Sequence, residues 1–225
     1  MIVSGPAGVG KSYSLEQKLK ESDPLGLRHT YVKGYMRATG LYRVLYERRG
    51  PDQIVIFDDA DKIFFEQTSL NILKAITDTT ETREVSYMSE YEMFDDGGEK
   101  LPKSFVFEGT AIFITNYDFD ALIAKDNEIS KHIAAMVSRS HYIDLAMTDA
   151  RYYMVRIKQV VALGMLRNMG LTEDQEAEVM AYMTDNRDNL RELSLRMALK
   201  IGGLRKNKPA TWQAMAKITC CKKSR

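Results

Sequence analysis

A glycine-rich octapeptide near the start of the chain has the residue types and the spacing of a phosphate-binding loop, G-x-x-x-x-G-K-S. Glycines let the backbone fold tightly, so that several N–H groups point at one anion. A helix that begins near Lys11 adds the positive end of its dipole, Lys11 reaches the β- and γ-phosphates, and the Ser12 hydroxyl holds Mg²⁺. The sequence therefore predicts that ATP and Mg²⁺ bind at Gly5, Pro6, Ala7, Gly8, Val9, Gly10, Lys11, Ser12 and Tyr13.

Two aspartates, Asp58 and Asp59, follow an apolar run over residues 54–57. Such a run is typical of a fully buried strand, and ligands bind at the carboxyl end of the strands in a doubly wound sheet. We expect Asp58 to hold Mg²⁺ through water and Asp59 to polarise an attacking water. An isolated pair of aspartates has an alternative interpretation as solvated acids in a loop. The phosphate-binding loop upstream favours the binding site over that alternative.

Two further polar residues stand next to predicted strands. Asn116 ends an apolar strand over 110–116, where it can orient water or contact the γ-phosphate. Arg139 precedes a strand over 141–145, and its planar, permanently charged guanidinium suits the γ-phosphate of a neighbouring subunit. Taken alone, Asn116 is a typical turn residue and Arg139 is a typical surface arginine. Their assignment to the γ-phosphate therefore depends on the motifs upstream.

Strands and helices alternate over the part of the chain that carries these residues, which favours an α/β core. We predict strands over 2–4, 28–33, 54–57, 110–116 and 141–145, and helices over 12–20, 40–48, 69–77 and in pieces over 118–135. Thr39 is the expected cap of the second helix. A β-hairpin is expected as an insert over about 81–109, because residues 83–87 and 104–107 alternate as strands do and 95–98 is a turn signal.

The pattern becomes all-helical after about residue 147, which predicts a core over 1–147 and a helical domain with a short basic tail over 148–225. Thr148 or Asp149 can cap a helix to about 168, and a capping box at 172–175 begins a helix to about 186. A third helix over 194–201 is expected to stop at Gly202-Gly203, before a basic loop over 204–208 and a last helix over 209–217. Cys220 and Cys221 are interpreted as tail residues.

Composition places the chain among ordinary globular proteins. Its 225 residues are 44% hydrophobic and 28% charged, with a formal net charge of +1, which gives no overall electrostatic argument for nucleic acid. Two adjacent cysteines form neither a disulfide framework nor a four-ligand metal site, which favours a reducing compartment. Without an apolar run of about 18 residues we expect no membrane partner and a cytoplasmic location. The loop starts a few residues after Met1, where many P-loop ATPases have an adenine-contacting segment, so a truncated or minimal form is expected.

In this order the motifs resemble those of the AAA+ ATPases. Residues 5–12 are similar to Walker A, 54–59 to Walker B, Asn116 to sensor 1 and Arg139 to the arginine finger, and the resemblance is strongest to small bacteriophage-encoded members. The resemblance covers nearly the whole chain. It implies a three-layer αβα P-loop NTPase fold with a parallel five-stranded sheet in the order 5-1-4-3-2 and a C-terminal helical lid. The lid would carry a sensor 2 arginine, for which Arg196 fits best and Arg191 is the alternative.

The family resemblance also implies an oligomer, a ring or open ring such as a hexamer, in which Arg139 completes the site of the next subunit. Asp59 departs from the family, which usually has glutamate there; this puts the rate of hydrolysis in doubt but not nucleotide binding. Tyr35, Met36 and Arg37 follow the second strand, where many members have a pore loop that grips a polymer. An ordinary loop with a packed tyrosine is an equally good interpretation of these three residues.

Three functions are compatible with these features. The first is an ATPase that remodels DNA or DNA-bound protein complexes in phage replication. The second is a slowly hydrolysing, nucleotide-dependent loader or scaffold, and the third is a protein unfoldase that uses the Tyr35 loop. The predicted hairpin has an acidic tip at Asp95, Asp96 and Glu99, which argues against direct phosphate contact unless Lys100 and Lys103 dominate.

Overall fold

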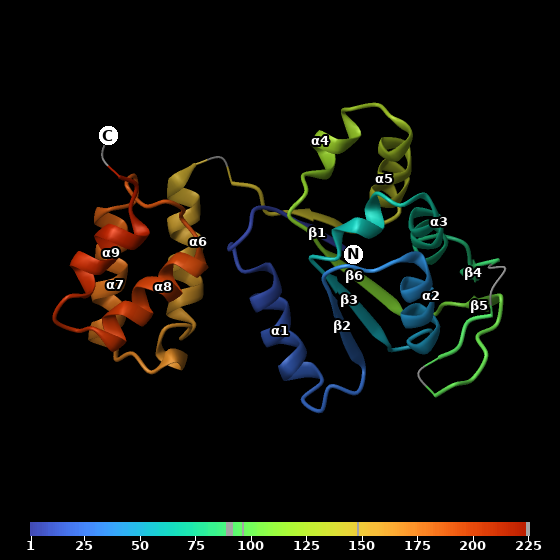
Figure 1. Cartoon of the computed structure of the whole chain (residues 1–225), viewed down its shortest axis with the longest axis horizontal. Coiled ribbons are helices and arrows are strands. Elements are labelled where there is room, and N and C mark those ends of the chain that lie inside the picture. Colours follow the sequence, from blue (N-terminus) through green and yellow to red (C-terminus); the bar gives the residue numbers. More distant parts are fainter. Residues whose placement is uncertain (89–91, 96, 148, 224–225) are drawn as a thin grey trace. The chain divides into compact units, whose positions relative to one another are not determined.

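The computed structural model describes residues 1–88, 92–95, 97–147 and 149–223 (Figure 1). The chain divides into two compact units, a core of Met1–Gly5 and Lys11–Leu145 and a helical unit of Pro6–Gly10 and Ala146–Arg225. The division after Leu145 lies close to the domain boundary predicted at residue 147. The middle of the glycine-rich loop is grouped with the helical unit, which the sequence did not predict.

The core is built on a parallel sheet of β1 (Ile2–Ser4), β2 (His29–Lys33), β3 (Ile54–Asp58), β6 (Thr110–Ile114) and β7 (Tyr142–Asp144). The strand order is β2-β3-β6-β1-β7. These labels differ from the expected 5-1-4-3-2 because the two strands of a separate hairpin, β4 and β5, are numbered as well. Counted by themselves from β7, the five strands of this sheet run 5-1-4-3-2, which is the expected order.

Helices cover both faces of this sheet. Alternate side chains of a strand point to opposite faces, so Ile56 and Ile112 pack with Leu19 of α1 (Lys11–Ser22). Phe57 and Phe113 face the other way, and their rings stack with centroids 5.2 Å apart. The second face is covered by α2 (Ala38–Glu47), α3 (Gln67–Ile76) and α5 (Glu128–Ser138), as Figure 1 shows. The predicted αβα layering of the core is thus present.

Two shorter helical segments complete the core, the 3₁₀ turn η1 (Asp61–Phe64) and α4 (Phe119–Ile123). One local prediction was wrong: α2 begins at Ala38, and its N-cap is Arg37, which makes no side-chain cap bond. Thr39 already lies inside the helix, so its hydroxyl is past the position from which it could cap the first turn.

The predicted insert is an antiparallel hairpin of β4 (Glu84–Ser86) and β5 (Ser104–Val106), shorter than the pattern indicated. Phe105 is buried, and its ring meets that of Tyr42 on α2 with centroids 5.0 Å apart. At the far end, Phe94 pairs with Lys100 around the predicted turn. Asp96, which belongs to that turn prediction, lies outside the described residues.

The helical unit contains α6 (Ala150–Ala162), the 3₁₀ turn η2 (Arg167–Met169), α7 (Glu173–Asp185), α8 (Leu195–Asn207) and α9 (Trp212–Cys220). Asp149 caps α6, because its side chain accepts from the Arg151 N–H; Thr148 lies outside the described residues. The capping box at the start of α7 is confirmed. The first helix ends earlier than predicted, since Gly164 at φ +94° breaks it.

Two predictions for this unit were wrong. The third helix runs through Gly202-Gly203 to Asn207, so residues 204–207 of the predicted basic loop are its last turn. Gly202 is a packing residue, because a Cβ there would lie 3.1 Å from Leu166 Cδ2. Cys220 and Cys221 are 3% and 5% exposed, so they are core residues and not a loose tail.

Candidate nucleotide-binding site

The sheet brings the predicted site residues of the core to one edge. Asp58 is the last residue of β3 and pairs with Ile114, the last residue of β6. Gly5 follows β1, the next strand along from β6, and Asn116 follows β6. Because carboxyl ends of neighbouring parallel strands lie at the same edge, residues more than a hundred positions apart become neighbours.

The ammonium group of Lys11 is held between two of these strand ends. It is 9% exposed, and its Nζ donates to the Gly5 carbonyl at 2.6 Å and to Asn116 Oδ1 at 2.9 Å. A buried cation requires such acceptors to replace water. Both of these acceptors are neutral oxygens, so an anionic phosphate oxygen would compete for the same hydrogens with a stronger, charge-assisted bond.

Ser12 and Asp58 form a pair of oxygen donors beside Lys11. The Ser12 hydroxyl donates to Asp58 Oδ1 at 2.8 Å, and Asp58 as a residue is 5% exposed. The second carboxylate oxygen lies 3.3 Å from Nζ of Lys33, at the end of β2. Hydroxyl and carboxylate oxygens are the donors that Mg²⁺ prefers, so the chemistry of this pair fits that ion. Lys33 compensates the buried negative charge, a contact that the sequence analysis missed.

Asp59 lies beside this pair in an unusual backbone conformation. Its φ is +56°, in the left-handed region where asparagine and aspartate are the non-glycine residues most often found. Its N–H bonds to the Ile114 carbonyl at 3.2 Å, and its carboxylate accepts from Asn116 Nδ2 at 2.8 Å. Asn116 therefore connects Lys11 to Asp59, and all three polar groups have a fixed orientation.

A third carboxyl group near this edge was not predicted. Burial raises the pKa of Asp61, and the charges of Asp59 and Asp58 raise it further, while the Thr115 hydroxyl and Lys11 act in the opposite direction. One oxygen of Asp61 is buried and has no hydrogen-bond partner among the described residues. The available signal was the run Asp58-Asp59-Ala60-Asp61, in which the last acid falls in η1.

In the helical unit, the middle of the glycine-rich loop packs against the start of α8. The Leu195 N–H donates to the Gly8 carbonyl at 2.8 Å, and a Cβ on Gly8 would lie 2.6 Å from Ser194 Cβ and 3.8 Å from Arg196 Cγ. Only glycine fits there, since φ is also +80°. Arg196 therefore lies beside the loop, whereas Arg191 bonds through its N–H to the Cys220 carbonyl at another place in this unit.

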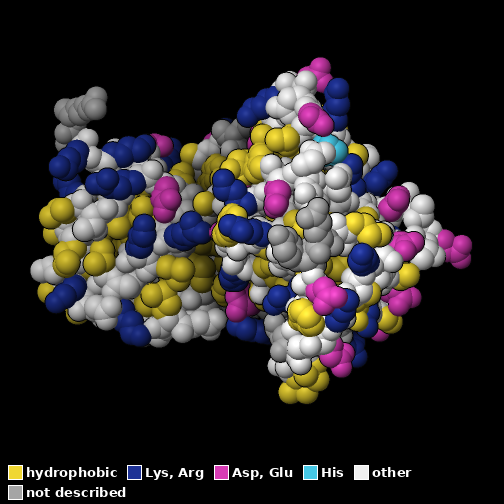
Figure 2. Space-filling view, turned by 45° about the vertical axis from the view of Figure 1, so that its right-hand side comes forward, with side chains coloured by type: hydrophobic (Ala, Val, Ile, Leu, Met, Phe, Trp, Pro, Cys, Tyr) yellow, Lys and Arg dark blue, Asp and Glu magenta, His cyan; other side chains and the backbone are white. Residues whose placement is uncertain are grey.

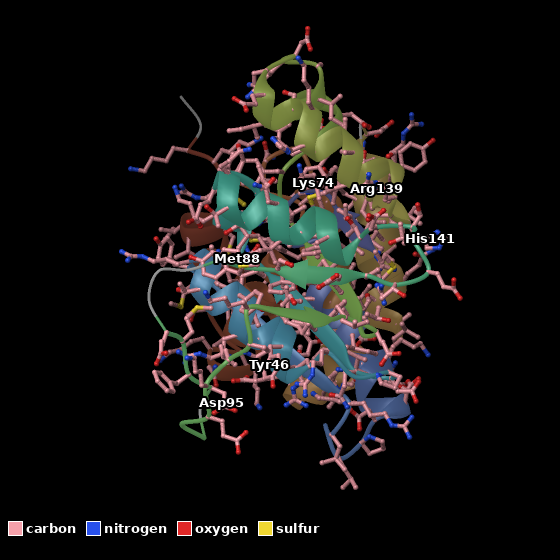
Figure 3. All side chains as sticks on the ribbon, turned by 90° about the vertical axis from the view of Figure 1, so that its right-hand side faces the viewer. Tyr46, Lys74, Met88, Asp95, Arg139 and His141 are labelled. Atoms are coloured by element: carbon pink, nitrogen blue, oxygen red, sulfur yellow. The ribbon has the colours of Figure 1, made fainter. Side chains whose placement is uncertain are left out.

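The structure gives the remaining predicted site residues surroundings of their own. Arg139, the C-cap residue directly after α5, has its guanidinium 3.9 Å from the carboxylate of Asp78. Arg139 and His141, both labelled in Figure 3, are exposed. Tyr35 is 71% exposed and accepts from Arg37 Nε at 3.4 Å, while Met36 packs against the core. Tyr13 is half-buried within α1, and Pro6, Ala7, Val9 and Gly10 belong to the helical unit.

Comparisons with known proteins give one relative in sequence. No family model matches the chain. An uncharacterized 36.7 kDa protein of Enterobacteria phage T4 is 32% identical over 218 residues, which are 96% of this chain. The match spans 66% of that relative's own length.

Similarity to solved structures is weaker. NtrX from Brucella abortus, in complex with ADP, has a TM-score of 0.48 at 13% identity and covers 92% of this chain and 46% of that chain. A second NtrX structure has a TM-score of 0.42 at 12% identity, over 92% and 47% of the two chains. Similarity at this level carries no argument about function. Among the described residues, no helix has both the length and the apolar character needed to cross a membrane.

Proposed function

We propose that this protein is an oligomeric, Mg²⁺-dependent ATPase of the AAA+ type that couples ATP binding and hydrolysis to remodelling of DNA or DNA-bound protein complexes. The observation that carries the proposal is the hydrogen-bonded set of Lys11, Ser12, Asp58, Asp59 and Asn116 at one edge of a parallel sheet. A glycine-rich loop, a lysine, a hydroxyl and two carboxylates at this edge are what binding a nucleoside triphosphate requires. The similarity to a phage T4 protein supports a role in the phage-infected cell.

Each residue of the set has a role that follows from its contacts. Lys11 exchanges its two neutral acceptors for phosphate oxygens when a nucleotide binds. Ser12 and Asp58 supply oxygens for Mg²⁺, which when bound neutralises charge on the β- and γ-phosphates. Asp59 accepts a hydrogen bond from the attacking water and Asn116 holds that carboxylate in place. Beside Gly8, Arg196 is the better candidate for sensor 2.

Arg139 is proposed to act on the nucleotide of a neighbouring subunit. Its guanidinium is 36% exposed, and its ion pair within the described part of the chain, to Asp78, is long at 3.9 Å, so little energy is lost when it leaves that partner. An arginine supplied by a second subunit stabilises charge in the transition state and raises turnover about 10³- to 10⁵-fold in related chemistry. This role requires a ring or open ring.

The experiment is steady-state ATP turnover against protein concentration, with and without single-stranded DNA. Wild type is compared with Lys11→Ala, Arg139→Ala and, as a control, Arg28→Ala, which removes an exposed arginine from the same unit. Turnover that rises steeply with concentration, and is lost in the first two variants only, supports the proposal. Turnover linear in protein and indifferent to Arg139 refutes the shared site. If no turnover depends on Lys11, the protein is not an ATPase.

A second candidate function is a nucleotide-dependent loader or scaffold that hydrolyses slowly. Asp59 favours this candidate, because its side chain is shorter than that of glutamate. Its carboxylate also already accepts a hydrogen bond from Asn116 Nδ2 at 2.8 Å. Tight ATP binding with slow turnover, raised strongly by Asp59→Glu, would support this candidate. The unfoldase alternative rests on exposed Tyr35 and Arg37, and turnover stimulated by unfolded protein but not by DNA would favour it.

A further inference from the structure

Charge is distributed unevenly between the two units. Residues 146–225 carry 15 lysines and arginines against 8 aspartates and glutamates, a net charge of +7, and the loop residues 6–10 of the same unit are uncharged. Residues 1–145 carry 17 against 23, a net charge of −6. The net charge of +1 for the whole chain is therefore the sum of a strongly basic helical unit and an acidic core. Such charge asymmetry is typical of a protein in which one unit binds a polyanion.

The acidic residues of the helical unit are concentrated on α7, which has five of the eight and no lysine or arginine. Each of the remaining three already has a basic partner. Asp149 pairs with Arg151 at 2.7 Å, Asp188 with Arg187 at 3.4 Å and Glu192 with Lys200 at 3.9 Å. Arg167 and Arg205 pair with carboxylates of α7, and the remaining lysines and arginines of this unit outnumber the carboxylates left to them.

Two chain segments that lie side by side bring part of this excess together. Leu190 and Cys221 form an antiparallel bridge, Arg191 N–H bonds to the Cys220 carbonyl at 2.9 Å, and Lys222 N–H bonds to the Asn189 carbonyl at 2.7 Å. Leu190 and Cys221 are buried, whereas their neighbours in the sequence, Arg191 and Lys222, are exposed. The buried pair thus fixes both segments, and their charged side chains lie in solvent.

We call this surface the basic rim and define it as Arg187, Arg191, Lys217, Lys222 and Lys223, all of them exposed. Lys217 comes from the last turn of α9, directly before the bridged segment. Figure 2 shows lysine and arginine side chains gathered at the upper end of the helical unit, with few acidic ones among them on the visible face. Among the residues that the structure describes, two carboxylates act on the rim. Asp188 forms a weak, exposed pair with Arg187. The pKa of Asp149 is lowered mainly by its hydrogen bond from Arg151, and the charge of Arg187 lowers it further.

We infer that the basic rim binds the phosphate backbone of DNA without regard to sequence. The inference rests on the proposed function and deepens it, because it assigns a DNA contact to the helical unit, whereas the hairpin tip of the core is acidic. Lysines and arginines along two adjacent antiparallel segments suit a linear polyanion whose charges repeat, and neutralising phosphates releases counterions, which drives binding. Exposed, flexible lysines provide charge and not base readout.

The test is fluorescence anisotropy of the full-length protein with a labelled single-stranded DNA of about 30 nucleotides, without ATP, across about 50–200 mM salt. Wild type is compared with Lys217→Gln/Lys222→Gln/Lys223→Gln. A matched control, Lys18→Gln/Lys125→Gln/Lys131→Gln, removes the same charge from exposed positions of the core. Circular dichroism checks that each variant folds.

We expect the rim variant to bind DNA at least tenfold more weakly at low salt. The magnitude of the slope of log K against log salt should fall by about 2, because each of the lost phosphate contacts contributes roughly 0.7. The control should match wild type. The inference is wrong if wild type shows no salt-dependent binding, if the control loses as much affinity as the rim variant, or if polyglutamate or anionic vesicles displace DNA equally well. Binding of a fluorescent ATP analogue, measured separately with Lys11→Ala, tests the proposed function alone.

Discussion

Replacing Asp59 by asparagine separates the chemistry of this residue from its structural role. Asparagine has the same shape, tolerates the left-handed backbone that Asp59 adopts at φ +56°, and offers an amide oxygen that can accept the same bond from Asn116. What the change removes is the negative charge that is proposed to polarise the attacking water. We therefore expect a folded protein that binds ATP and hydrolyses it far more slowly than wild type.

The structure sets the expected magnitudes. Loss of a positioned base reduces turnover about 10²- to 10⁴-fold. Because the backbone conformation and the hydrogen bond are both kept, the free energy of unfolding should change by less than about 0.5 kcal/mol. Asp59→Ala, in contrast, loses the 2.8 Å bond to Asn116 and places alanine at positive φ, which costs about 1–2 kcal/mol. The melting temperature should then fall by about 2–8 °C.

The assay is steady-state phosphate release at saturating Mg²⁺-ATP, with melting temperature followed by circular dichroism. Asp126→Asn is the matched control, since Asp126 is also exposed and at positive φ, +46°, but lies outside the site. Its turnover should equal that of wild type. The reasoning is refuted if Asp59→Asn keeps more than half of the wild-type turnover, or if the control loses activity to the same extent.

Three other predictions follow from particular contacts. Ser12→Ala removes the hydroxyl that donates to the buried Asp58 carboxylate, so it should lower the free energy of unfolding by about 1.5–3 kcal/mol. Nucleotide affinity should also no longer respond to Mg²⁺. An unchanged Mg²⁺ titration would contradict the assignment of Ser12 and Asp58 as oxygen donors to the ion. Burial raises the pKa of Asp61, so the folded protein binds this proton more tightly than the unfolded chain, and stability is lost as pH rises through the interval between the unfolded and folded pKa values. Asp61→Asn should therefore raise the melting temperature at neutral pH and have a smaller effect in acid, and a gain that is equal at both pH values would contradict this origin. Gly203 lies inside α8 with open space around its missing Cβ, so Gly203→Ala should stabilise the helical unit by about 1 kcal/mol, and a lower melting temperature would show that the helix does not continue there.

The core was predictable from the sequence because its signals are local. Apolar runs such as 54–57 and 111–114 mark strands buried on both faces, and the spacing of glycines, lysine and serine over residues 5–12 marks a loop that leads into a helix. Predicted strands and helices therefore lie close to the observed ones. Errors occurred where a local signal had two meanings: a glycine pair can end a helix, or it can let two helices approach, as Gly202 does against Leu166.

The connections within the site were decided by the tertiary structure. Lys11 and Asn116 are 105 residues apart, and only the pairing of β3, β6 and β1 in one register brings their side chains to 2.9 Å. The same holds for the contact of Lys33 with Asp58 and for the position of Arg196, not Arg191, beside Gly8. A sequence pattern specifies which residue types follow one another. Burial and proximity depend on which strands pair, and pairing is a property of the whole chain.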